Sequence, residues 1–203
     1  VDAFHSHNHP ALATTGVETV IEQSLVLPHP IKRFSVSLDL ATDVCVISLV
    51  PGFHDDCIKG FIDQYKARPK PKDPRAIVFA LYGTGNAPQK KGGFVKLVQE
   101  AIDAGIEVAV TSQCPSGRTN LAAYETGAQL LHMGVITSLD MTLEACVTKL
   151  SYLMGRGISG RLLKEKMETN IRGELTRLDP SVDDRLSVAQ VSGGNRRALQ
   201  LYH

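Results

Sequence analysis

The stretch "AIVFALYGTGNAP", residues 76–88, joins an apolar run of strand length to a turn with two glycines and an asparagine. A continuous apolar run of this length is typical of a strand that is buried on both faces of a parallel sheet. Two more such runs are present, "VCVISLV" at 44–50 and "IEVAVTSQ" at 106–113. Because a segment with helical spacing follows each run, the three runs indicate the core of an α/β fold.

The segments after these strands carry the signals of helix ends. Gly105 and Gly134 stand where left-handed carboxyl caps are expected, Asp140 or Thr142 begins the fourth helix, and Ser159 is expected to cap the last. The pattern predicts an open parallel sheet covered by helices on both faces, a Rossmann-like three-layer arrangement. The predicted helices cover residues 55–65, 92–105, 121–134, 140–155 and 159–175.

The composition narrows the class of protein. With 203 residues, 43% hydrophobic and 21% charged, the chain resembles an ordinary soluble globular protein. The net charge of +1 does not indicate a nucleic-acid-binding surface. No apolar run is long enough to span a bilayer, and the first residues show no signal peptide. Four cysteines without a CxxC pair favour buried free thiols in a reducing compartment. We therefore expect a cytoplasmic protein without nucleic-acid or membrane partners.

The chain divides into an irregular amino-terminal part, a linker or edge strand, a regular α/β domain and a polar tail: residues 1–30, 31–42, 43–176 and 177–203. In open parallel sheets, ligands meet the loops at the carboxyl ends of the strands. The turn at 83–88 is such a loop, and we therefore treat it as a candidate site.

This turn does not fit a dinucleotide fingerprint, because Pro88 stands where the third glycine is needed. Gly83 and Gly85 are instead expected to allow unusual backbone angles and to present the side chain of Asn86. A carboxamide has one acceptor and two donors, which suit an ammonium or a carboxylate group. In the structural alternative, Asn86 only stabilises its own turn.

Other reactive side chains have simpler explanations. His5, His7 and His9 alternate as metal ligands on one strand face would, but the surrounding residues favour a loop, and no carboxylate or cysteine is spaced to complete a metal site. Nothing in the sequence brings His132 to Cys114 to form a nucleophilic pair. The region around Glu144 and Lys149, five residues apart, is explained by helix capping and core packing.

Several motifs resemble the carboxyl-terminal domain of the bacterial cytoplasmic (type I) L-asparaginases, a group that includes mammalian lysophospholipase/asparaginase homologues. They are "LYGTGNAP", "VAVTSQCPSG", "YETGAQLLHMGVITSLDMTLEACVTKLSYLMG" and "NIRGEL". The opening "VDAFHSHNHPALATTG" resembles the end of that family's amino-terminal domain, with its "DAF-S-N-P" framework. The resemblance extends from residue 1 to about residue 176.

The resemblance implies hydrolysis of L-asparagine to L-aspartate and ammonia, without a cofactor or metal, through a threonine nucleophile and an acyl-enzyme. In the family, this threonine lies in an early "GGTI" loop, and a Thr-Asp pair with its lysine assists it. Neither motif occurs here, because both Gly-Gly pairs precede residues other than threonine and Thr42-Asp43 precedes Val44. We therefore expect no catalytic residue in this chain, with the nucleophile upstream of it.

The resemblance also implies a homodimer or homotetramer in which Asn86, held by Gly83 and Gly85, reaches the L-asparagine or L-aspartate bound to a neighbouring subunit. In several type I enzymes, positions matching Asn86 and Cys114 line a regulatory asparagine site. The family's arginine just before the turn is absent here, where residues 80–81 are Ala-Leu.

Two alternatives remain open at this point. The chain could be a catalytically silent fragment that serves as an oligomerisation or amino-acid-binding regulatory module. It could also be an ammonia-supplying amidotransferase subunit for tRNA-dependent synthesis, which shares the fold, although the near-neutral charge gives this little support.

Overall fold

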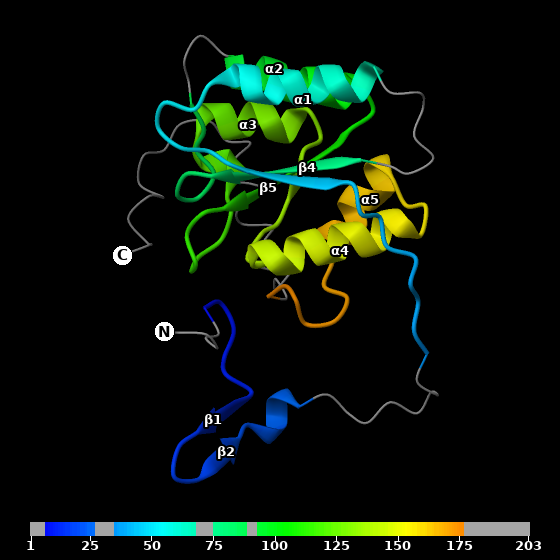
Figure 1. Ribbon diagram of the computed structural model, residues 1–203. Coiled ribbons are helices and arrows are strands. Elements are labelled where there is room, and N and C mark those ends of the chain that lie inside the picture. The colour runs from blue at the N-terminus through cyan, green and yellow to red at the C-terminus, as the bar shows by residue number, and fades with distance from the viewer. Residues whose placement is uncertain (1–6, 27–34, 68–74, 89–92, 177–203) are drawn as a thin grey trace.

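The computed structural model describes residues 7–26, 35–67, 75–88 and 93–176. These residues form an α/β domain and, before it, a short segment with a β-hairpin (Figure 1). The predicted polar tail, residues 177–203, and His5 lie outside the described residues.

Four parallel strands form the main sheet, in the spatial order β3-β4-β5-β6. The three apolar runs become β3, β4 and β5, as predicted, and Phe79 of β4 lies opposite Ile47 of β3 and Val110 of β5. The sequence does not predict β6, because its two residues are too few to show a strand pattern. The strands cover Val44–Ser48, Ala76–Leu81, Glu107–Ser112 and Ile136–Thr137.

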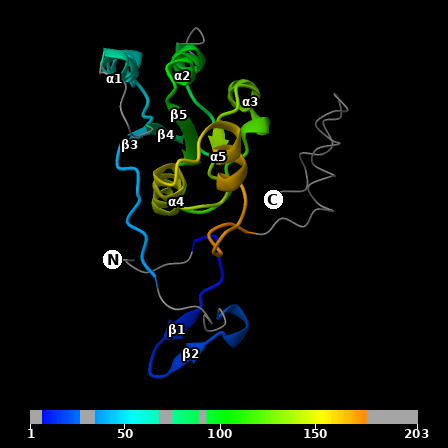
Figure 2. The ribbon, with the colours of Figure 1, turned by 90° about the vertical axis from the view of Figure 1, so that its right-hand side faces the viewer.

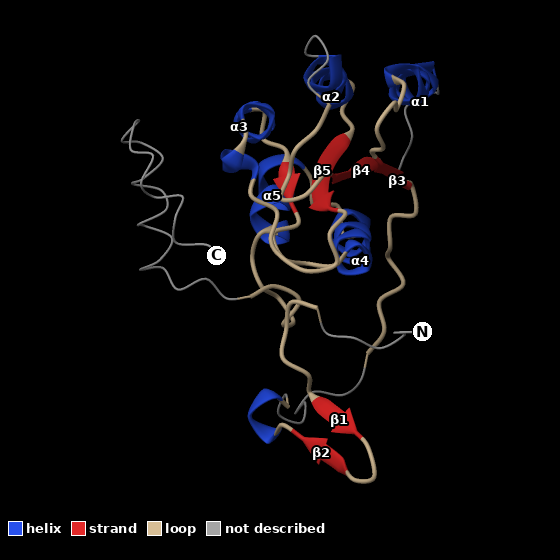
Figure 3. Cartoon of the chain, turned by 90° about the vertical axis from the view of Figure 1, so that its left-hand side faces the viewer, coloured by secondary structure: helices blue, strands red, loops and turns tan. Residues whose placement is uncertain are grey.

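Helices cover both faces of the sheet, as predicted, with α1, α2 and α3 on one face and α4 and α5 on the other (Figures 1 and 3). Because the strands follow one another in space as in the chain, crossovers of one hand place the first three helices on the same face. Among the described residues, no helix has the length and apolar character needed to span a bilayer. The helices cover Asp55–Ala67, Gly93–Asp103, Glu125–His132, Leu143–Gly155 and Gly160–Met167.

The sheet separates two apolar cores. Ile77, Phe79 and Leu81 of β4 belong to the core beneath α1, α2 and α3. Ala76 and Val78, at the alternate positions, belong to the core beneath α4 and α5. Because the side chains of a strand point alternately to the two faces, a strand between two helical layers is buried throughout. All six residues of β4 are therefore buried.

The third predicted helix, residues 121–134, is broken in the structure. It begins with a short 3-10 helix, η3 (Leu121–Ala123), and α3 starts only after Tyr124. Gly127 of α3 lies so close to η3 that a Cβ atom there would be 2.1 Å from the carbonyl oxygen of Leu121. The first turn of α3 thus packs directly on the backbone of η3, which a larger residue would prevent.

The last predicted helix, residues 159–175, ends early, because α5 stops at Met167. The Lys149 ammonium of α4 donates to the carbonyl oxygens of Met167 and Thr169 at 2.8 and 2.6 Å. It also pairs with the Glu174 carboxylate at 2.7 Å. A cation at this end of a helix satisfies carbonyl groups that have no partner within the helix. Lys149 therefore has a structural role, as the interpretation of its segment predicts.

The segment before the domain has no apolar core of its own. We refer to residues 7–26 as the arm, which contains β1 (Ala13–Thr15), β2 (Thr19–Ile21) and the 3-10 helix η1 (Gln23–Leu25). Strands β1 and β2 form an antiparallel hairpin in which every residue is exposed. Figure 2 shows this hairpin apart from both helical layers of the domain.

The described part of the predicted linker, residues 35–42, contains no strand. It runs along α4, where the Ala41 N–H donates to the Ser151 carbonyl at 2.9 Å. A Cβ atom on Gly155 would lie 2.2 Å from the carbonyl oxygen of Asp39, so the linker and helix backbones are in direct contact. The described residues of this segment therefore form no edge strand. Its role as a linker between two domains stays a prediction.

Candidate functional site

The turn after β4 holds Asn86 in a tight geometry. The backbones of Tyr82 and Asn86 exchange two N–H···O hydrogen bonds, both 2.9 Å long. Gly83 and Gly85 have φ angles of 51° and 131°, in a region that side chains rarely allow. Gly85 is also crowded, because a Cβ atom there would lie 3.2 Å from the Leu121 side chain. The prediction that two glycines permit this turn is confirmed.

The Asn86 carboxamide is half-buried and uses one of its polar groups within the turn. Its Oδ1 accepts the N–H of Ala87 at 2.9 Å, as in the structural alternative. Its Nδ2 makes no hydrogen bond to the described residues, so both of its N–H groups can donate to another molecule. Of the two ligand groups expected from the sequence, a carboxylate accepts such donors and an ammonium does not.

The last residue of β5 and the loop after it, together residues 112–120, support this turn from the side. The Ser112 hydroxyl donates to the carbonyl oxygen of Gly83. The backbone N–H of Asn120 donates to the carbonyl oxygen of Thr84 at 2.6 Å. Two carbonyl groups of the turn are therefore held by one neighbouring loop, which limits how the turn can move.

Gln113 of the same loop joins the ends of three strands. Its Nε2 donates to the carbonyl oxygens of Leu49, just after β3, and Ala80 of β4, at 2.6 and 2.8 Å. Its backbone N–H donates to the carbonyl oxygen of Leu81 at 3.0 Å. Sequence reasoning missed this residue, because a polar side chain after a strand is typical of any loop. Its role is evident only from the structure, in which the carboxyl ends of the three strands lie next to one another.

Three buried hydroxyl groups lie beneath the loop. The Ser138 Oγ donates to the Thr111 Oγ1 at 3.0 Å and lies 3.3 Å from the Thr119 Oγ1. The backbone N–H of Thr119 donates to the carbonyl of Leu139, whose φ angle is 56°. Buried hydroxyls that satisfy one another fix the segments that carry them. The loop is therefore anchored to the ends of β5 and β6.

Cys114 and His132 do not form a nucleophilic pair. Cys114 follows the carboxyl end of β5, and its backbone N–H donates to the Ser112 hydroxyl at 2.9 Å. His132 ends α3, which leads into the amino end of the parallel strand β6. The two residues therefore lie at opposite ends of the sheet, and an acyl-transfer site of this kind is excluded.

All four cysteines are free thiols. Burial raises the pKa of the Cys146 thiol to about 12, although the Lys149 ammonium favours the thiolate. Burial likewise raises the pKa of Cys45, which is half-buried in β3. Cys57 and Cys114 are exposed. The prediction of buried thiols is therefore correct for Cys146 and wrong for these two residues, which lie on a helix surface and a loop.

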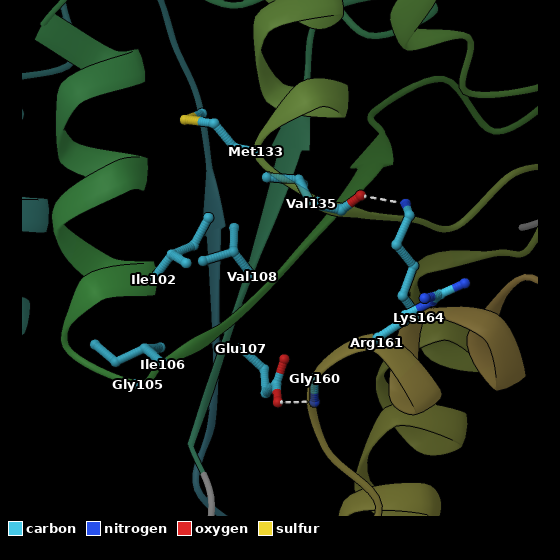
Figure 4. A pocket seen from close by; sticks show the side chains of 11 residues that line it. Ile102, Gly105, Ile106, Glu107, Val108, Met133, Val135, Gly160, Arg161 and Lys164 are labelled. Carbon is cyan, nitrogen blue, oxygen red and sulfur yellow. Dashed lines mark hydrogen bonds between the residues drawn. The ribbon is translucent and has the colours of Figure 1, made fainter.

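A pocket of about 370 Å³ lies away from this site, at the amino ends of β5 and β6 (Figure 4). Two of its three charged side chains are engaged with the protein, since Glu107 accepts the backbone N–H of Gly160 and Lys164 donates to the Val135 carbonyl, both at 2.6 Å. The third, Arg161, is exposed. Ser159 is the N-cap residue of α5, as predicted, but its side chain accepts no hydrogen bond from the helix. The Glu107 carboxylate accepts the N–H of Gly160, the first residue of the helix.

The histidine cluster contributes no metal site in the part of the chain that the structure describes. No group of three His, Cys, Asp or Glu side chains there could hold a metal ion. His7 lies near the Ser116 hydroxyl, with 3.5 Å between the Nδ1 and Oγ atoms.

Comparison with known proteins points to the same domain. Residues 43–167, more than half of the chain, match the family model described as the glutaminase/asparaginase C-terminal domain. The chain belongs to this family. The resemblance seen in the sequence is therefore confirmed, and so is the α/β fold that it implies.

The relatives of this glutaminase/asparaginase-family chain carry several names. L-asparaginase 1 of Escherichia coli K12 is 37% identical over 175 residues, which cover 86% of this chain and 49% of the relative. A glutamyl-tRNA(Gln) amidotransferase subunit of Methanothermobacter thermautotrophicus is 33% identical over 196 residues, 95% of this chain and 40% of the relative. The human 60 kDa lysophospholipase is 31% identical over 185 residues, 90% of this chain and 30% of the relative.

The crystal structure of L-asparaginase I from Vibrio cholerae has the same fold, with a TM-score of 0.71 and 31% identity. The superposition covers 86% of this chain and 50% of that chain. The chain therefore spans about half the length of these two L-asparaginases.

Proposed function

We propose that this chain is the carboxyl-terminal domain of an asparaginase-type amidohydrolase, which converts L-asparagine to L-aspartate and ammonia. Family membership supports the type of reaction. The observation that carries the role of this domain is the Nδ2 of Asn86, which has no hydrogen-bond partner among the described residues and is presented by a rigid turn. The nucleophilic threonine would lie outside these 203 residues, which lack both family motifs for it.

In this proposal, Asn86 binds a carboxylate of the substrate. L-Asparagine has one carboxylate group and L-aspartate has two, so both present the acceptor that the two Nδ2 N–H groups require. A hydrogen bond to a charged group is stronger than one between neutral groups. Two or four copies assemble, and Asn86 of one copy completes the substrate pocket of its neighbour.

The first experiment compares two polypeptides. We expect ammonia release from L-asparagine when the upstream region is present, and none from residues 1–203 alone, because the activated hydroxyl is absent from the shorter chain. Fast turnover by the 203-residue chain would contradict the assignment of roles.

A pair of Asn86 variants tests the binding role in the longer polypeptide. Asn86→Asp keeps an oxygen to accept the Ala87 N–H but loses both N–H donors and adds a negative charge. We expect kcat/KM to fall by roughly tenfold to a hundredfold, mostly through a higher KM, as when a hydrogen bond to a charged group is lost. Asn86→Ala should have a similar effect.

The matched control is Thr84→Ala, because Thr84 is exposed and its backbone carbonyl, not its side chain, accepts a hydrogen bond. Its KM should stay unchanged. An unchanged KM in Asn86→Asp would remove Asn86 from the substrate site. The regulatory asparagine site expected at Asn86 and Cys114 has its own test, since Cys114→Ser should then alter a sigmoidal dependence of rate on asparagine.

A second candidate function is that of an ammonia-supplying amidotransferase component, favoured by the amidotransferase match over 95% of the chain. Ammonia release would then require a partner protein and charged tRNA. The longer polypeptide should be assayed with asparagine and with glutamine in the absence of any partner. Release from either amide without tRNA favours the hydrolase.

A further inference from the structure

One asparagine of the arm contacts two distant loops of the domain. The Oδ1 of Asn8 accepts the backbone N–H of Gly117 at 2.8 Å, and its Nδ2 donates to the carbonyl oxygen of Asp140 at 2.7 Å. The orientation of this carboxamide is fixed, because an N–H must meet its oxygen and a carbonyl must meet its nitrogen. Asn8 is half-buried. Both of its polar groups therefore serve to join segments that lie far apart in the sequence.

The residues around Asn8 extend this junction. The Asp140 carboxylate accepts the backbone N–H of Thr176, with distances of 3.2 and 3.1 Å to its two oxygens. The arm, the loop at 112–120, the segment before α4 and the segment after α5 thus meet at one place. Figure 2 shows the beginning of the arm close to the chain that follows α5. In the described residues, the hydrogen bonds that join the arm to the domain involve His7 and Asn8.

The same loop leads from Asn8 to the candidate site. Gly117 lies between Ser112 and Asn120, whose hydroxyl and backbone N–H hold the carbonyl groups of the Asn86 turn. Because this loop is hydrogen-bonded to the Asn86 turn, a shift of Asn8 relative to Gly117 would also shift the arm relative to that turn.

We propose that Asn8 is a positioning residue, which fixes how the arm and any polypeptide before it are placed relative to the Asn86 turn. One of its hydrogen bonds holds the arm to the loop that contains Gly117, and the other holds the arm to the segment that contains Asp140. The catalytic consequence of this role rests on the proposed function: if the reactive hydroxyl belongs to polypeptide preceding the arm, Asn8 aligns it with Asn86. Alignment of reacting groups to within about 1 Å strongly affects rates.

The test uses residue-resolved amide hydrogen exchange of the 203-residue chain. In Asn8→Ala, we expect the Gly117 N–H to exchange about fivefold to tenfold faster, as for a lost hydrogen bond, while amides in β4 keep their rates. In Asn8→Asp, Gly117 should stay protected, because a carboxylate oxygen still accepts its N–H. The contact with the Asp140 carbonyl should be lost in that variant, since the donor is gone and two oxygens face each other.

His9→Ala is the matched control, since it removes a half-buried neighbour on the arm while leaving Asn8 in place. Unchanged Gly117 exchange in Asn8→Ala would overturn the proposal, as would an equal loss of protection throughout β4 and β5, which indicates a general loss of stability. Protection of Gly117 in Asn8→Asp, with loss in Asn8→Ala, supports it.

Kinetics of the longer polypeptide separate this proposal from the proposed function. If the positioning role of Asn8 and the proposed hydrolase function are both correct, Asn8→Ala lowers kcat about tenfold. It changes KM less than Asn86→Asp does. If no ammonia is released but Gly117 exchange responds to Asn8 as described, the proposed function fails and the positioning of the arm stands. If asparagine is hydrolysed and Asn8→Ala changes neither kcat nor Gly117 exchange, the role of Asn8 fails and the hydrolase stands.

Discussion

Phe79 in β4 is completely buried, whereas Val20 in β2 keeps 68% of its surface exposed. Both residues have strong strand propensity and both lie in paired strands. The difference is that helices cover both faces of β4, and no described element covers the hairpin. The same local signal thus produces a core strand in one place and an exposed strand in another.

The comparison shows that the domain and the arm are held by different interactions. Burial of apolar side chains stabilises the domain, and a two-stranded hairpin without such a core is only marginally stable in water. The arm is instead joined to the domain by polar contacts of His7 and Asn8. Its exposed apolar side chains, among them Leu12 and Ile21, add no burial that would hold it in place.

The largest effect is expected from Phe79→Ala. This change removes a fully buried ring that packs edge-on against Phe94, with 5.1 Å between the ring centres. The free energy of unfolding should fall by about 3–5 kcal/mol, the usual result of such a cavity. Denaturant unfolding measures it, and a loss below about 1 kcal/mol would contradict the view that this core stabilises the domain.

A smaller loss, about 1–3 kcal/mol, is expected from Gly127→Ala, because a Cβ atom would clash with the Leu121 carbonyl oxygen. Gly60→Ala is the matched control. Gly60 also lies in a helix, but a Cβ atom there meets nothing within 4 Å, so this variant should gain roughly 0.5–1 kcal/mol. Thermal unfolding of both proteins should give shifts of opposite sign.

Glu174 represents a third kind of contact, an ion pair at the edge of the domain. Burial alone would raise its pKa, but hydrogen bonds from Lys149 and from the backbone N–H groups of Ile171 and Arg172 hold the pKa at about 2. Between about pH 4.5 and pH 2 the unfolded chain binds a proton that the folded chain does not, so stability falls as the pH falls. Glu174→Gln should flatten this part of the pH dependence, and an unchanged slope in acid unfolding would show that the pair contributes little.

The smallest effect is expected from Val20→Ser in the arm. Because this side chain is mostly exposed, the free energy of unfolding should change by less than about 0.5 kcal/mol. A decrease in the free energy of unfolding as large as that of Gly127→Ala would mean that the hairpin is covered in solution. It would contradict the view that the arm, unlike the domain, is not stabilised by apolar burial.

The sequence predicts those elements whose signals are local. The continuous apolar runs identify β3, β4 and β5, and Gly105 and Gly134 have the positive φ, 82° in both, expected of helix caps. Thr142 caps α4 as predicted, since its hydroxyl accepts the Ala145 N–H at 3.2 Å. The turn at Asn86 could also be predicted from the sequence, because the spacing of its glycines is a local feature.

Features that depend on distant contacts were not predictable in this way. The break before α3 arises from the approach of Gly127 to Leu121, which the helical spacing of that segment conceals. Gln113 and Asn8 act through carbonyl groups more than 30 positions away in the sequence. In the segment "HSHNHP" the histidines carry the stronger chemical signal, although the asparagine among them makes two of the hydrogen bonds with the domain.

The uneven exposure of the thiols makes this chain suitable for site-directed labelling without engineered attachment points. A maleimide reacts with thiolates, so Cys146 should remain unmodified while Cys57 and Cys114 react. With Cys57 and the half-buried Cys45 replaced by serine, a single fluorophore on Cys114 would lie on the loop that contacts both Asn8 and the Asn86 turn. Its emission would then report on displacement of the arm and would test whether L-asparagine or L-aspartate binds near Asn86.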